Sequence, residues 1–113
     1  MAKPLDFNKL KKRYLNVTLA DEKQTTIMIG TPTKSVMDDL LAMRSALEEV
    51  ESDDVDADVM NDLYDVCAKV MSRNKGGVTI TADHLAECLD FEDIMIFFNA
   101  YMEFVGEIAD EKN

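Results

Sequence analysis

The apolar segment 91–108 constrains the fold more than any other part of this 113-residue chain. Placed on a helix, its large apolar residues cover an arc of about 180°, which is wider than the stripe of a helix that packs on one side. The residues of this arc are Phe91, Ile94, Met95, Phe97, Phe98, Tyr101, Met102, Phe104, Val105 and Ile108, and Ile96 falls outside it. The sequence therefore predicts a long final helix with more apolar surface than one small core needs, which indicates a partner.

Two short β-forming runs precede the helical part of the chain. Residues 14–19 and 25–29 are rich in side chains that favour strands, and the polar residues 20–24 between them suit a turn, so the sequence predicts a β-hairpin. Gly30 and Pro32 then interrupt the second run and separate it from the first helical pattern.

Helical periodicity accounts for most of the remaining chain. Apolar residues recur every three or four positions in 34–51 and again in 57–73, which predicts two amphipathic helices. Thr81 can cap a brief helix that ends near Leu89, and Asp90 can cap the final one. Thr33 or Ser35 can cap the helix that starts at Lys34.

These elements predict a single α+β domain that is mainly α. A length of 113 residues with 47% hydrophobic content suits one compact core and leaves little room for a second. The expected parts are a basic N-terminal segment at 1–13, the hairpin at 14–29, a helical body at 34–109 and a tail at 110–113. The helical body comprises three longer helices and one short one.

The charge distribution argues against a nucleic-acid-binding role. Residues 1–34 hold seven Lys/Arg against three Asp/Glu, whereas residues 35–113 hold five against twenty, and the net charge is −11. A body of this kind lacks the basic face that releases counterions from a phosphate backbone. We also expect no membrane association and a cytoplasmic location, because no apolar run reaches the roughly 18 residues of a membrane span. Cys67 and Cys88 fall in apolar helical patterns and are expected to be reduced and buried.

Patterns that suggest metal or catalytic chemistry are incomplete. Asp54, Asp56 and Asp58 imitate the first ligands of a calcium loop, but the Gly and the Glu that such a loop needs further on are missing. A zinc site would require Cys67, His84 and Cys88 to converge, and a fourth ligand is not identified. We therefore predict no catalytic residues, no metal, no cofactor and no enzyme activity, with a metal-dependent enzyme as an outside alternative.

The order of elements, together with residues 5–7 (Leu-Asp-Phe), 32–34 (Pro-Thr-Lys) and 97–101 (Phe-Phe-Asn-Ala-Tyr), resembles the tail assembly chaperones of long-tailed phages and prophages of Gram-positive bacteria. The resemblance implies a small, acidic, mainly helical protein that binds the tape measure protein and keeps it soluble. It also implies recruitment of tail tube subunits during tail morphogenesis, with the tail tube protein as a second partner. Such a chaperone acts in the cytoplasm of the bacterial host and is not expected in the mature virion.

Within this hypothesis, three residues of the final helix are predicted to bind the partner. Ile96, Phe97 and Phe104 lie at or beyond the edge of the apolar arc, where they would form a surface for the client or for self-association into a homo-oligomer. Phe91, Ile94, Phe98, Tyr101, Val105 and Ile108 lie near its centre and are assigned to the core. The alternative function is a small acidic adaptor, or a nucleic-acid mimic that inhibits a DNA-binding protein, because the acidic body could imitate phosphates.

Overall fold

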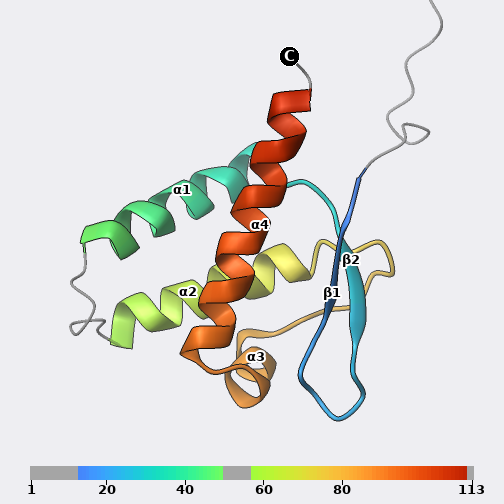
Figure 1. Cartoon of the computed structure of the whole chain (residues 1–113). Coiled ribbons are helices and arrows are strands. Elements are labelled where there is room, and N and C mark those ends of the chain that lie inside the picture. Colours follow the sequence, from blue (N-terminus) through green and yellow to red (C-terminus); the bar gives the residue numbers. More distant parts are fainter. Residues whose placement is uncertain (1–12, 50–56, 112–113) are drawn as a thin grey trace, which may run out of the picture.

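The computed structural model describes residues 13–49 and 57–111, with side chains described as far as Ile108 (Figure 1). The predicted basic segment up to Lys12, the motif at 5–7, Asp54, Asp56 and the end of the tail lie outside the described residues. The elements in chain order are β1 (Leu15–Thr18), β2 (Thr26–Ile29), α1 (Lys34–Glu49), α2 (Ala57–Met71), α3 (Ala82–Cys88) and α4 (Phe91–Glu111).

The predicted fold class is confirmed, because an antiparallel hairpin precedes three longer helices and one short helix. β1, β2 and α3 are each shorter than predicted by one residue at one or both ends, and the ends of α2 and α4 differ by two residues. α2 ends at Met71 rather than at 73, since the Asn74 side-chain amide donates to the Met71 carbonyl (2.9 Å) and the chain turns there. α4 runs on to Glu111, past the predicted limit of 109, and Glu107, Ala109 and Glu111 in its last turns favour a helix.

The caps at the starts of three helices are those predicted from the sequence. Thr33 accepts a hydrogen bond from the Val36 amide (3.3 Å), and Thr81 accepts one from the His84 amide (3.1 Å). Asp90 and Asp93 cap α4 reciprocally, because the side chain of each accepts the main-chain N–H of the other, at 2.8 Å and 3.1 Å. These short-range bonds confirm the caps predicted for α3 and α4, and they select Thr33 over Ser35 for α1.

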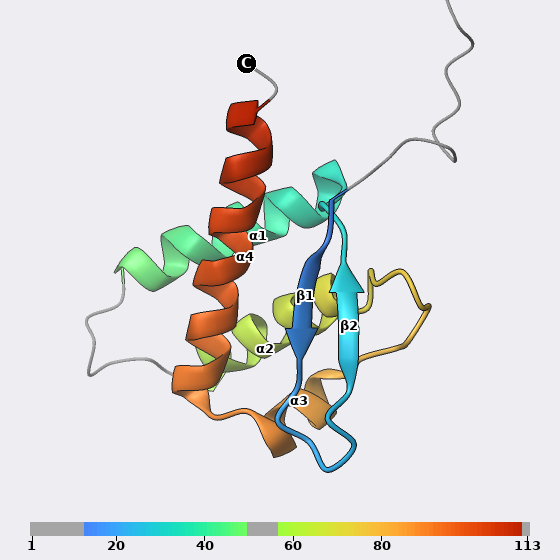
Figure 2. The same cartoon turned by 45° about the vertical axis from the view of Figure 1, so that its right-hand side comes forward.

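The hairpin is bound to the helices along one of its two edges. β1 pairs with β2 in the register Leu15 to Ile29. On the other side of β2, the Gly30 amide donates to the Arg73 carbonyl (3.3 Å) and the Lys75 amide to the Met28 carbonyl (2.9 Å). The loop after α2 therefore covers β2, whereas β1 forms the outer strand on the side of α4 (Figure 2).

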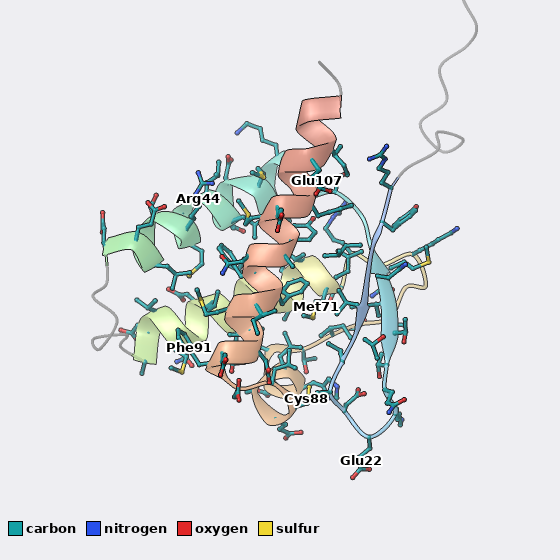
Figure 3. All side chains as sticks on the ribbon, in the orientation of Figure 1. Glu22, Arg44, Met71, Cys88, Phe91 and Glu107 are labelled. Atoms are coloured by element: carbon teal, nitrogen blue, oxygen red, sulfur yellow. The ribbon has the colours of Figure 1, made fainter. Side chains whose placement is uncertain are left out.

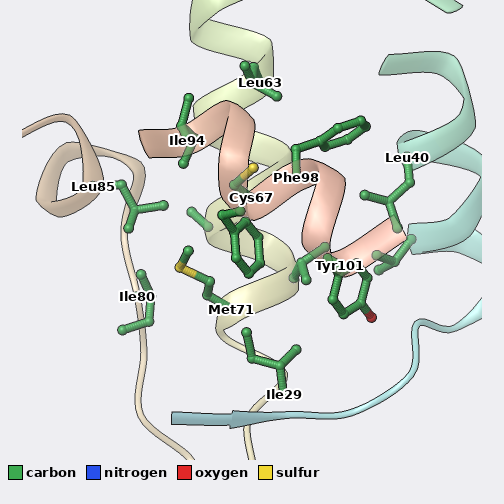
Figure 4. Packing of buried hydrophobic residues seen from close by; sticks show 14 of the residues in the cluster. Ile29, Leu40, Leu63, Cys67, Met71, Ile80, Leu85, Ile94, Phe98 and Tyr101 are labelled. Atoms are coloured by element: carbon green, nitrogen blue, oxygen red, sulfur yellow. The ribbon is translucent and has the colours of Figure 1, made fainter. Parts of the chain in front are cut away.

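The hydrophobic core lies where α2 meets α1, α3, α4 and β2. Buried side chains from these elements converge in Figure 4. The largest fully buried members are Ile29, Leu40, Leu63, Cys67, Val70, Met71, Leu85, Ile94 and Tyr101. Two tyrosine hydroxyls also join distant segments: Tyr101 donates to the Gly30 carbonyl (2.8 Å), and Tyr64 to the Leu89 carbonyl (2.7 Å). Over the described residues, no helix is both long and apolar enough to cross a membrane.

Candidate protein-binding groove

The apolar arc of α4 is only partly used by the core. Ile94, Phe98 and Tyr101 are buried, as predicted. Phe91 and Val105 are half-buried and pack against the core, so they lie at its margin, whereas Ile108 is half-buried and is not part of it. The reason is geometric, because Phe91 begins the helix and the last turns of α4 extend beyond α1 (Figures 1 and 2).

The three residues predicted to bind a partner occupy different environments. Ile96 is 61% exposed, the largest exposure among the exposed large apolar residues that the structure describes. Phe104 is half-buried, with its ring 5.9 Å from that of Tyr101. Phe97 is only 8% exposed and stacks on Tyr101 at 6.0 Å, so the expected exposed position of Phe97 is wrong. Phe97 belongs to the cluster of buried core residues, and it lines a groove whose opposite wall is β1. Binding by these residues stays a prediction.

Ile96 and Phe97 line a groove between β1 and α4 that has a volume of about 250 Å³. The strand forms one wall and the helix the other, and the two elements lie side by side in Figure 2. The lining residues are Leu15, Asn16, Val17, Thr18, Leu19, Met71, Leu89, Asp93, Ile96, Phe97 and Ala100. Most of these side chains are apolar, and Ile96 extends the apolar surface from the groove out into solvent. A surface of this kind suits an apolar protein segment.

The electrostatic character of the groove is acidic. Asp93 is the only charged residue among its described lining residues, and it lies in the first turn of α4, next to Glu92. The chain as a whole carries a net charge of −11. The groove is therefore suited to an apolar segment with neighbouring Lys or Arg residues.

A second depression, of about 760 Å³, lies between the hairpin loop and α3. Asp21 organises it: its carboxylate accepts hydrogen bonds from the Thr25 hydroxyl (2.7 Å), the Thr25 amide (2.8 Å) and His84 Nε2 (3.0 Å). The bonds from Thr25, with a smaller contribution from His84, lower the pKa of Asp21 from 3.8 to about 2. This pairing fastens the hairpin loop to α3.

The Asp21–His84 pair was not predicted from the sequence. The spacing of Asp21 and Thr25 is a local turn signal, but 63 positions separate Asp21 from His84. A carboxylate and an imidazole in one depression are also components of catalytic triads, in which a nucleophile accompanies them.

Cys88 lines the same depression, near the hairpin loop (Figure 3). Burial, with a smaller contribution from the negative charge of Asp21, raises the pKa of the Cys88 thiol. A raised pKa keeps the thiol protonated at neutral pH, which is the opposite of what a cysteine nucleophile requires. The geometry therefore supports a structural role for the Asp21–His84 pair.

Cys67, His84 and Cys88, which would have to converge to form a zinc site, are not grouped as metal ligands. Cys67 is fully buried in the core, where desolvation raises its pKa to about 12, and Cys88 is half-buried rather than buried as expected. Across residues 13–49 and 57–111, no group of three His, Cys, Asp or Glu side chains is arranged to hold a metal ion. Asp58, the described member of the calcium-like pattern, is exposed.

No protein-family model matches the chain, and comparisons with curated proteins and with solved structures found no similar protein.

Proposed function

We propose that this chain is a tail assembly chaperone of a phage or prophage, which binds the tape measure protein and keeps it soluble until the tail tube forms around it. The observation that carries this proposal is the apolar groove between β1 and α4, with Ile96 61% exposed beside it, on a chain of net charge −11. The resemblance in element order and dispersed residues supports the same function.

The groove provides what a chaperone of this type needs. An unassembled tape measure protein is long and exposes apolar residues that would otherwise aggregate, so a protein that covers them prevents association between clients. Met71 lies beneath the groove and is fully buried, and its flexible thioether can adjust the packing under the groove when apolar side chains of different shapes bind. The excess of carboxylates on the chaperone then keeps a coated complex soluble by repulsion.

The proposal also includes a cellular location and a second protein partner. The chaperone would act in the cytoplasm of the host bacterium and be left out of the mature virion. It would release the client as tail tube subunits polymerise, so the tail tube protein is proposed as the second partner. Self-association along α4 would allow several copies to coat one client.

Co-expression tests the proposal directly. The chain is produced together with the longest open reading frame of its gene neighbourhood, and the fraction of that protein that is soluble and co-purifies is measured. We expect the unmodified chain to keep the client soluble and Ile96→Asp to lose most of that effect. Leu41→Asp is the matched control, because Leu41 is an exposed apolar helix residue (38%) outside the groove.

The results of this co-expression test distinguish the chaperone function from the location of the binding site. If the unmodified chain fails to keep the client soluble, the chaperone function is contradicted. If it does so and both variants retain the effect, the function stands and the groove is not the binding site.

A further inference from the structure

We infer that the client enters the groove as an extended strand, which adds to the outer edge of β1 and places apolar side chains against Phe97 and Ile96. This inference rests on the proposed function, because it specifies how the proposed client is held. The segment recognised would be apolar at alternating positions and would carry Lys or Arg beside them.

The main chain of β1 carries the argument. The Leu19 amide donates to the Thr25 carbonyl (2.8 Å), so Leu19 points its N–H toward β2. Main-chain groups alternate in direction along an antiparallel strand, and the N–H and C=O groups of Asn16 and Thr18 therefore point away from β2. Within the part of the chain that the structure describes, these outward groups form no hydrogen bond. An open edge of this kind is a template for one more strand.

The adjoining surface supplies the contacts for side chains. Asn16 and Thr18 line the same groove as Phe97 and Ile96, so a strand paired with β1 would also lie against α4. β1 has four residues, a length of about 13 Å at roughly 3.3 Å per residue, which accommodates about four residues of a client. Because side chains alternate along a strand, every second residue of that client segment would face the groove.

Charge favours a basic client over a second copy of this chain. Asp93 contributes a carboxylate to the groove, and its described lining residues include no Lys or Arg. Pairing two β1 edges would bring together two chains that each carry −11. A client segment with Lys or Arg next to its apolar residues is instead attracted to the groove.

Two substitutions of Asn16 distinguish binding through the main chain of β1 from binding through its side chains. The probes are fluorescent peptides of about ten residues, tiled over the tape measure protein of the same gene neighbourhood, whose Kd is measured by anisotropy. Asn16→Pro removes an outward N–H and puts a ring at the edge, a change that edge strands tolerate. We expect it to weaken the best-binding peptide about tenfold, equivalent to about 1.4 kcal/mol. Asn16→Ala keeps the N–H and should change Kd less than about threefold.

Failure of this inference is distinguishable from failure of the proposed function. If the client binds as a helix, Asn16→Pro will bind like Asn16→Ala while Ile96→Asp still loses binding, which overturns strand addition and leaves the chaperone function intact. If the unmodified chain oligomerises through β1 and binds no peptide, the inferred client is wrong.

Hydrogen exchange on the unmodified chain covers the case in which Asn16→Pro does not fold. The amides of Asn16 and Thr18 should exchange rapidly in the free protein and become protected when the best-binding peptide is added. Rapid exchange of both amides in the saturated complex would overturn the inference.

Discussion

α4 has two apolar faces, and they differ in what covers them. The inner face, with Ile94, Phe98 and Tyr101, is closed by the other elements of the core. The outer face borders the groove beside β1, where Ile96 is exposed and the buried Phe97 forms part of the lining. Residues of equal hydrophobicity on one helix therefore serve either the stability of the fold or a surface that is available to a partner, and their neighbours in space decide which.

The two faces are connected through β1 and β2. The Tyr101 hydroxyl on the inner face donates to the Gly30 carbonyl, just after β2, and so holds the hairpin against α4. The Asp21–His84 pair fastens the other end of the hairpin to α3. Both bonds position β1, which is the second wall of the groove. The inner face is therefore expected to affect binding indirectly, through the placement of the strand.

The largest expected loss of stability comes from a substitution on the inner face of α4. Phe98→Ala should lower the free energy of unfolding by about 3–5 kcal/mol, because the ring is 2% exposed and its removal leaves a cavity. Urea denaturation followed by circular dichroism measures the change. A loss below about 1 kcal/mol would show that the inner face contributes little to the stability of the fold.

A smaller loss of stability is expected when the bond between the inner face of α4 and the hairpin is removed. Tyr101→Phe removes the hydroxyl that donates to the Gly30 carbonyl and keeps the ring, so it should cost about 1 kcal/mol. Thermal and urea unfolding measure it, with Tyr64→Phe as a comparison that removes a hydroxyl bond to Leu89 instead. Unchanged stability in Tyr101→Phe would mean that the bond to the Gly30 carbonyl does not help to hold the hairpin.

The anchor at the other end of the hairpin should depend on pH. The pKa of Asp21 is lowered from 3.8 to about 2 in the folded chain, so the ionised carboxylate stabilises the fold fully above pH 3.8. That contribution is lost as the pH falls toward 2. Asp21→Asn should therefore be less stable than the unmodified chain at pH 6, and the difference should shrink between about pH 4 and pH 2. Urea unfolding at a series of pH values measures it, and a constant difference would contradict the assignment.

The smallest effect on stability is expected on the outer face. Ile96→Ser should change the free energy of unfolding by no more than about 0.5 kcal/mol, because the side chain is 61% exposed. The same denaturation assay measures it beside Phe98→Ala. A cost above about 1 kcal/mol would show that Ile96 supports the fold, and the contrast between the two faces would then disappear.

The sequence by itself determined the elements, their order and the caps at the starts of α3 and α4. Periodicity located the three longer helices, the Thr81 cap located the short one, and β-forming runs around a polar turn located the hairpin. Each of these signals acts over a few residues. The surplus of apolar residues in the final helix was also visible, and with it the exposure of Ile96.

Tertiary structure alone decided which apolar residues face a neighbour. The helical arc put Phe97 at its edge, yet the ring is 8% exposed, stacks on Tyr101 and belongs to the core. The groove needs β1 next to α4, and the Asp21–His84 pair joins residues 63 positions apart. Periodicity describes the faces of one helix, whereas burial depends on which distant segment packs against each face, and that is settled only when the whole core forms.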